Sequence, residues 1–249
     1  MKRLFKASAL AAVAAATALS ASAAGRSTLP PPGTESYGYT PIALGIATPV
    51  QIPWGFTWDV YALDASFFYA DANEVTGLEI SLGGCVSRTY MAGAQISGLC
   101  NYSDGDVYGL QTAIACVTDD VYGLQTSAFA MGKSMYGLQA GLLGTVSEGD
   151  LYGVRAAGLA NVSMGESLSC GVELAGLANV SRKVEGFQGA IGCNYAENLH
   201  GFQLAIVNYA QSSSTSAVQI GLVNIIRDNV VPVLPIVNGC FFDGTEGEY

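Results

Sequence analysis

The sequence predicts an all-β chain built from a tandem repeat, and three observations support this prediction. A Gly-apolar-Gln triplet recurs along the chain at intervals of 14 to 18 residues. After the triplets, apolar residues alternate with period 2, as in a strand, and not with the helical period of 3.6. No proline occurs from Trp54 to Val231, and a continuous sheet excludes proline from its central strands. A repeat of near-constant period is typical of an array built from one supersecondary unit.

The first element is expected to be a signal peptide over residues 1–24. Lys2, Arg3 and Lys6 form a positive beginning, an apolar run covers 9–19, and small residues at 21–23 suit a signal peptidase. The apolar run is too short to span a bilayer, which needs about 20 residues. Residues 25–36 contain three consecutive prolines and are expected to form an extended tether. We therefore expect an exported protein, located at the cell surface, in the outer membrane or in the periplasm.

The repeats are expected to occupy residues 61–229 of a single repeat domain over 37–242. The triplet is perfect at Gly109, Gly123 and Gly137, and phenylalanine takes its middle position at Gly186 and Gly201. Eleven copies begin at 62, 77, 93, 109, 123, 137, 153, 171, 186, 201 and 217. The copies at 153 and 171 carry Arg155 and Glu173 in place of glutamine.

A second landmark, a small-apolar-x-Asn tetrad, follows the triplet in about half of the units. It ends at Asn101, Asn161, Asn179, Asn208 and Asn224. If the tetrad is one extended strand, the apolar residue two before the asparagine shares its face. We therefore expect Leu142, Leu159, Leu177, Ile206 and Leu222 to face inward, and the glutamine column, including Gln125, to face outward. The asparagines are expected to form a buried ladder, because a buried amide needs partners for its donors and acceptor. Units 109–140 lack the asparagine and should interrupt it.

The two ends of the domain are marked by proline. Residues 37–60 are predicted to cap the first unit, with Trp54 and Trp58 covering it. Residues 230–242 are predicted to cap the last unit, where Pro232 and Pro235 would blunt an open sheet edge. Residues 243–249 are expected to be an acidic tail.

Three architectures fit this pattern, and we favour a parallel β-solenoid of about eleven units of about 15 residues. Each unit would then form one coil, with equivalent residues stacked about 4.8 Å apart. The alternative is an antiparallel outer-membrane β-barrel, which suits the export, the acidity and the glycine and tyrosine content. Short connections throughout argue against the barrel. The third arrangement is an antiparallel sheet that stacks on a partner.

The same units resemble a known family. Residues 201–208 (GFQLAIVN) and 218–224 (VQIGLVN) fit best, and 49–51 followed by 58–61 resembles that family's lead-in. The chain is similar over about 40–242 to exported bacterial surface-repeat proteins with tandem Gly-apolar-Gln-x-Gly-apolar-x-Asn units. The resemblance implies a repeat-built surface protein and implies no established activity.

Little in the sequence indicates chemistry. With 20 acidic against 10 basic residues and a formal net charge of −10, a nucleic-acid partner is not expected. The glycines form no phosphate loop before a helix, so no nucleotide partner is expected either. The single histidine, His200, stands where other units carry tyrosine, which favours a structural position over a catalytic base. We expect no catalytic residue, no cofactor and no metal site.

Two cysteines raise the question of a disulfide bond. Cys100 and Cys116 both lie seven residues after the first glycine of their units. A parallel stack would bring such residues within disulfide distance. Small buried apolar side chains are the alternative, and we favour it.

Two surface features have alternative interpretations. The acidic turns either hold calcium or form a solvated edge that prevents aggregation, and we favour the edge. They contain Asp104, Asp106, Asp119 and Asp120. A column of tyrosines either binds a glycan or protein partner or only stabilises the array by cross-strand stacking, and we favour stacking. The column consists of Tyr108, Tyr122, Tyr136 and Tyr152.

The expected function is therefore a non-enzymatic, exported surface or envelope scaffold for adhesion or assembly. An outer-membrane channel or anchor is the alternative. A glycan, a protein surface, the outer membrane and a second copy of the chain stay open as partners.

Overall fold

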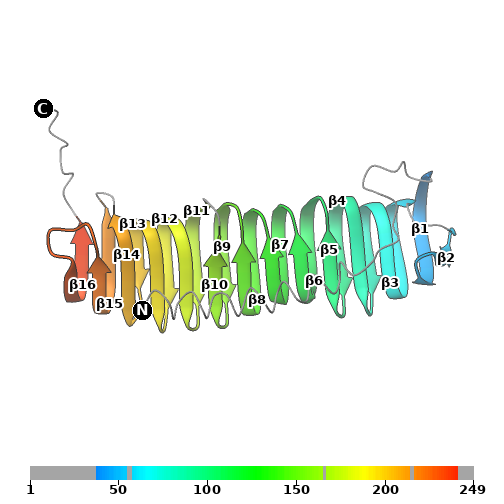
Figure 1. The fold of residues 1–249 in the computed structure, drawn as a ribbon. Helices are drawn as coiled ribbons and strands as arrows, with labels where there is room; N and C mark the ends of the chain where they lie inside the picture. The colour runs from blue at the N-terminus through cyan, green and yellow to red at the C-terminus, as the bar shows by residue number, and fades with distance from the viewer. Residues whose placement is uncertain (1–37, 55–57, 165–166, 214–215, 241–249) are drawn as a thin grey trace, which may run out of the picture.

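The chain folds as a parallel β-solenoid in the computed structural model, which describes residues 38–54, 58–164, 167–213 and 216–240. Coils stack side by side from β1 (Gly38–Ala47) at one end to β16 (Val233–Cys240) at the other (Figure 1). The described residues contain no helix. This arrangement confirms the predicted fold class. The expected signal peptide (1–24), tether (25–36) and acidic tail (243–249) lie outside the described residues.

The strands between the two ends follow the repeat. In chain order they are β2 (Val50–Ile52), β3 (Trp58–Ser81), β4 (Gly84–Ser97), β5 (Cys100–Ser103), β6 (Asp106–Thr118), β7 (Val121–Gly132), β8 (Met135–Ser147), β9 (Leu151–Ala157), β10 (Ala160–Ser163), β11 (Leu168–Ala175), β12 (Ala178–Ala190), β13 (Cys193–Leu204), β14 (Val207–Ser213) and β15 (Ala217–Ile226).

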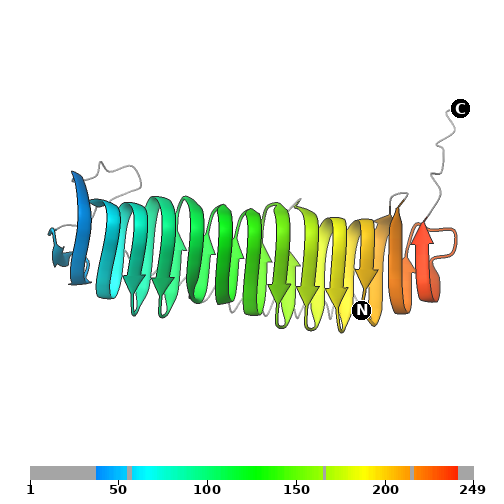
Figure 2. The same ribbon diagram turned by 180° about the vertical axis from the view of Figure 1, so that it is seen from behind.

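Neighbouring coils pair in parallel, so each residue lies beside its equivalent in the next unit. Gln111 on β6 is opposite Gln125 on β7, and Asn179 on β12 is opposite Asn194 on β13. Among the described strands, antiparallel pairing is confined to the ends, where β2 joins β1 and β16 joins β15. The view from behind shows the same unbroken stack (Figure 2). The antiparallel alternatives are therefore wrong.

The recurring glycine is explained by the backbone of the stack. Gly109 has φ 135°, a conformation that side chains disfavour. A Cβ added to Gly109 would lie 2.0 Å from the carbonyl oxygen of Gly93 in the preceding coil. Gly109 is therefore required for two independent reasons.

The inside and the outside of the coil are the reverse of our expectation. Leu159 is 47% exposed and Leu222 is 69% exposed, whereas Gln125 is fully buried. The leucines and isoleucine predicted to face inward at 142, 159, 177, 206 and 222 are all exposed. The reason is a corner: the chain bends at residues 158–159, so Leu159 lies outside while Asn161 points inward. Strict alternation holds within a strand but not around a corner.

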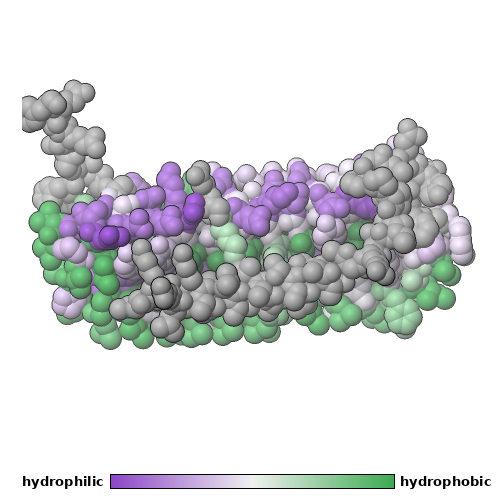
Figure 3. All heavy atoms as spheres, viewed as in Figure 1, coloured by the Kyte–Doolittle hydropathy of each residue, from purple (hydrophilic) through white to green (hydrophobic). Residues whose placement is uncertain are grey.

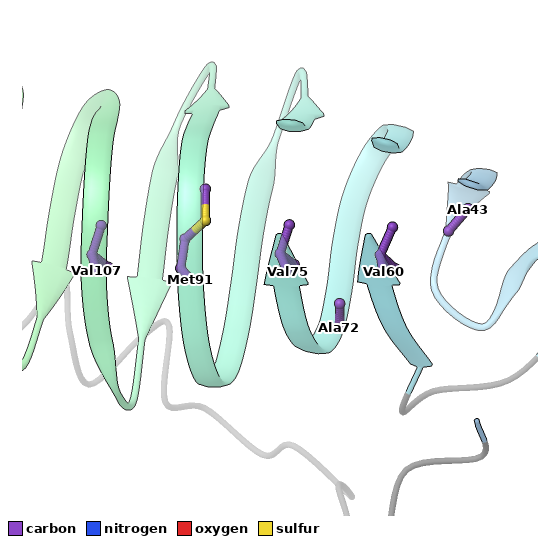
Figure 4. Packing of buried hydrophobic residues seen from close by; sticks show 6 residues of the cluster. All are labelled: Ala43, Val60, Ala72, Val75, Met91 and Val107. Carbon is purple, nitrogen blue, oxygen red and sulfur yellow. The ribbon is translucent and has the colours of Figure 1, made fainter. Parts of the chain in front are cut away.

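Columns of apolar and of polar side chains fill the interior. One column is apolar, and its Val60, Val75, Met91 and Val107 follow one another from coil to coil (Figure 4). Val121, Met135 and Leu151 form a second cluster further along the stack. The other columns are polar and consist of the glutamines, of the asparagines, and of small hydroxyl residues such as Ser87, Ser103 and Thr118. The core is therefore held together by hydrogen bonds as well as by apolar packing.

The end of the stack near β1 is closed by only one of the two tryptophans that we predicted. Trp58 packs against the apolar cluster of the first coils. Trp54 is 70% exposed and does not cover the first unit.

Candidate functional site

The glutamine column forms a ladder of amide hydrogen bonds that run in one direction in both halves of the stack. Gln111 Nε2 donates to Gln95 Oε1 at 2.8 Å, and Gln125 Nε2 donates to Gln111 Oε1 at 2.7 Å. Beyond the middle of the stack, Gln203 Nε2 donates to Gln188 Oε1 at 2.8 Å. Each amide donates a hydrogen bond to the preceding coil, and each except Gln139 and Gln219 also accepts one from the following coil, which satisfies most of a buried polar column.

A buried ion pair interrupts this ladder at its centre. Arg155 donates to Glu173 in the next coil, and both side chains are buried. Glu173 also accepts hydrogen bonds from Gln188 Nε2 at 2.6 Å and Ser181 Oγ at 2.7 Å. Burial alone would raise the pKa of Glu173, but Arg155 and the hydrogen bonds outweigh it and hold the pKa below its usual value. The pair therefore keeps its charges inside the coil.

The sequence contained a signal for this pair that we did not use. Arg155 and Glu173 replace glutamine in two consecutive units. In a parallel stack, opposite charges at the same position of neighbouring units must meet. The expectation that this column faces outward does not place the two charges inside the coil.

Two carboxyl groups end the glutamine ladder on the β1 side. Glu79 Oε2 accepts from Gln95 Nε2 at 2.7 Å, but its Oε1 and both oxygens of the buried Asp64 have no hydrogen-bond partner. Burial, reinforced by Asp71, raises the pKa of Asp64 to about 7. Burial and the nearby Asp64 raise the pKa of Glu79 well above its usual value. Protonation of this pair lowers the cost of burying two acids together.

The asparagine column is the ladder that we predicted. Asn161 Nδ2 donates to Asn179 Oδ1 at 2.8 Å, and Asn179 Nδ2 donates to Asn194 Oδ1 at 2.9 Å. The same Asn179 amide also donates to the carbonyl oxygen of Gly189 at 2.9 Å, next to the corner. Each asparagine thus joins two coils and satisfies corner backbone. The predicted interruption is also present, because Cys116 pairs in register with Asn101.

The tyrosine column forms a tight stack on the outside of the solenoid. The ring centroids of Tyr108 and Tyr122 are 4.6 Å apart, those of Tyr122 and Tyr136 are 4.7 Å apart, and the rings are nearly parallel. Tyr152 extends the stack at 5.3 Å. The ring faces are occupied by one another, so edges and hydroxyl groups are what the stack presents. His200 lies opposite Glu185 at the equivalent position, as expected for a variant of this column.

The acidic turns bind neighbouring turns and backbone. Asp119 pairs with Lys133 at 2.7 Å, and Asp120 Oδ1 accepts from the Ser134 backbone N–H at 3.0 Å. Asp150 Oδ1 accepts from the Leu168 N–H at 2.8 Å. Nowhere in the described chain do three His, Cys, Asp or Glu side chains gather closely enough to hold a metal ion. The turns therefore have a structural explanation that needs no calcium.

The two candidate cysteines lie on opposite sides of the sheet. Cys100 pairs with Ala115, and Cys116 pairs with Asn101, so the two are offset by one residue. Cys116 points inward, and burial raises the pKa of its thiol to about 12. Both cysteines are free.

An apolar edge runs along the corner that follows the glutamine strands. The residues of this apolar edge are Leu82, Leu99, Ile114, Leu142, Leu159, Leu177, Ile191, Ile206 and Leu222, all exposed. Hydrophobic side chains line this border of the molecule, while hydrophilic side chains gather along the opposite border (Figure 3). Exposed apolar areas that extend along a whole molecule mark interaction sites. The apolar edge is therefore the candidate functional surface.

A shallow groove of about 650 Å³ adjoins the middle of the apolar edge. Small residues form part of its lining, among them Ala156, Ala157 and Gly158. Leu142 and Ile191 belong to both the groove and the edge. Its lining contains no charged side chain, so it suits an apolar occupant.

The described residues include no helix that is long and apolar enough to span a membrane. Stacked in-register coils, two amide ladders and an apolar edge define the class of the protein as a parallel β-solenoid with a partly polar core. In comparisons with known proteins, the chain matches no family model, no curated protein and no solved structure.

Proposed function

We propose that the protein is an exported surface or envelope scaffold, with a structural or adhesive role and no catalytic activity. One observation carries this proposal: the same contacts recur from coil to coil and engage most of the buried polar side chains. The ladders of glutamine and asparagine, and the Arg155–Glu173 pair, hold coils together. What repetition produces is a stiff body with a long, uniform surface.

Export is supported by the character of residues 1–24. Their positive beginning, apolar run and small residues match a secretory signal. The likeness of units 201–208 and 218–224 to exported bacterial surface-repeat proteins supports the same location. The acidic turns on one edge suit a solvent-facing position.

Location is tested by expressing the full chain in a Gram-negative bacterium. We expect a product that lacks about the first 24 residues, fractionates with the envelope or periplasm, and folds as β-sheet. The matched control is the triple variant Lys2→Glu/Arg3→Glu/Lys6→Glu, which should keep its leader and stay inside the cell. An unprocessed wild-type chain in the cytoplasm would contradict the proposed export.

A further inference from the structure

We propose that the apolar edge is a self-association surface, and that two copies of the chain meet edge to edge about a two-fold axis. This proposal concerns the described residues alone and does not depend on where the protein resides. Three observations support it: the area of the apolar edge, the placement of charge and the groove beside the edge.

The first observation is the area. The edge extends over nine coil-to-coil steps, from the coil of Glu79 to the coil of Gln219. At about 4.8 Å a step, it is about 43 Å long. The two walls of a coil are about 10 Å apart, so the corner alone has about 400 Å². A stable interface buries about 800 Å² on each partner, so the pairing also uses the exposed apolar flank beside the groove, which includes Leu174 and Leu204.

The second observation is the placement of charge. Each charged side chain of the described residues is buried in the coil or lies at or beside the corner opposite the apolar edge, as Asp119, Lys133 and Glu148 do. Each face of a coil runs for about six residues, or about 20 Å. Edge-to-edge pairing would hold the two acidic borders about 40 Å apart, several times the screening length of about 8 Å.

The same charge distribution disfavours a lipid surface. Membrane-surface elements carry lysine or arginine beside the apolar face, together with aromatic anchors. The apolar edge consists of leucine and isoleucine, with the exposed Phe67 and Phe68 beside Leu82 at its β1 end, and no basic residue adjoins it. The chain has a formal net charge of −10, so an anionic membrane would repel it.

The third observation is the groove. In a two-fold interface the same patch is used by both copies, so knobs and hollows must lie on one surface. Leu142, which is 73% exposed, and Ile191, which is 71% exposed, project beside the hollow at Ala157 and Gly158. The groove lies near the middle of the stack, where a two-fold axis brings knobs of one copy to the hollow of the other.

The test is the mass of the purified protein by sedimentation equilibrium. We expect the wild type at twice its monomer mass. The triple variant Leu142→Gln/Leu177→Gln/Ile191→Gln should weaken dimerisation at least about tenfold. Its circular dichroism should be unchanged, because all three side chains are exposed. If that variant misfolds, the single variant Leu142→Gln should still weaken dimerisation measurably.

The matched control replaces exposed apolar residues that lie at the two ends of the stack. Ile52→Gln/Val233→Gln/Val237→Gln should remain a dimer. A monomeric wild type would overturn the proposal. In that case, sedimentation with phosphatidylcholine vesicles would assign the edge to lipid, and an absence of vesicle binding would assign it to another part of the chain or another protein. Loss of the dimer in the control but not in the edge variant would also overturn it, in favour of end-to-end contact.

Discussion

The Arg155–Glu173 pair shows how one position of the repeat sets the chemistry of the core. Arg155 can only donate and Glu173 can only accept, so together they interrupt a ladder whose other members do both. Gln139 Oε1 and Arg155 Nε face this break without partners. An ion pair of this kind is weak evidence for stability, because desolvation offsets the attraction.

We therefore expect opposite effects from single and double substitution. Arg155→Gln or Glu173→Gln alone should destabilise the protein by about 3–5 kcal/mol, because one buried charge loses its partner. The double variant Arg155→Gln/Glu173→Gln restores an all-glutamine ladder and should recover most of this loss. The free energies of unfolding of the wild type, the two single variants and the double variant are measured by chemical denaturation. A double variant as unstable as the sum of the two single variants would contradict the account.

The Asp64–Glu79 pair predicts an unusual dependence of stability on pH. Both pKa values are raised in the fold, so the fold favours the protonated forms. Their contribution is fully present below about pH 4, where the unfolded chain is also protonated. It falls as the pH rises toward about 7, the folded pKa of Asp64.

Asp64→Asn/Glu79→Gln should therefore raise the melting temperature at pH 8 more than at pH 5. Each kcal/mol corresponds to about 2–4 °C for a chain of this size. The exposed variant Glu148→Gln is the control and should leave the difference between the two pH values as in the wild type. Equal gains at pH 5 and pH 8 would show that the pair is ionised in the fold.

At the scale of the element, the corner between two strands depends on its asparagine. Asn179 joins the coils before and after it and also bonds a carbonyl group at the corner. Asn179→Leu should lower stability by at least about 1–3 kcal/mol, because it leaves buried partners unsatisfied. Asn198 lies in β13 and not in a turn, but its side chain is exposed, so Asn198→Leu should have little effect. Equal melting temperatures for these two variants would show that the asparagine ladder does not contribute to stability.

The repeat was enough to predict the strands, the parallel stack and the asparagine ladder. It was not enough to predict which face is inside. Alternation with period 2 separates two faces of a strand but does not say which one is buried. Hydrophobicity favours burial of Leu159 over burial of Gln125. In the structure, the bend at residues 158–159 exposes Leu159, and the hydrogen bond to Gln111 keeps Gln125 inside. The bend lies within one coil, but the ladder is a relation between neighbouring coils, so a single unit of the sequence does not contain it.

At the scale of the whole molecule, repetition gives a rod with two unlike borders. One border is acidic and polar, and the other is the apolar edge (Figure 3). The interior is polar enough that apolar residues are left for the surface. The surface of the rod is therefore amphipathic, and a scaffold can use its apolar border for assembly.

The orientation of the coil is tested most directly by two substitutions compared side by side in thermal unfolding. Gln125 donates to Gln111 Oε1 at 2.7 Å and accepts from Gln139 Nε2 at 2.7 Å, inside the coil. Gln125→Glu removes the donor and buries a charge, so it should lose the cooperative transition or melt far below the wild type. Leu159→Asp places its charge on an exposed corner and should keep the wild-type β-sheet spectrum and a cooperative transition. The reverse result, with Gln125→Glu tolerated and Leu159→Asp unfolded, would contradict a core of glutamine ladders.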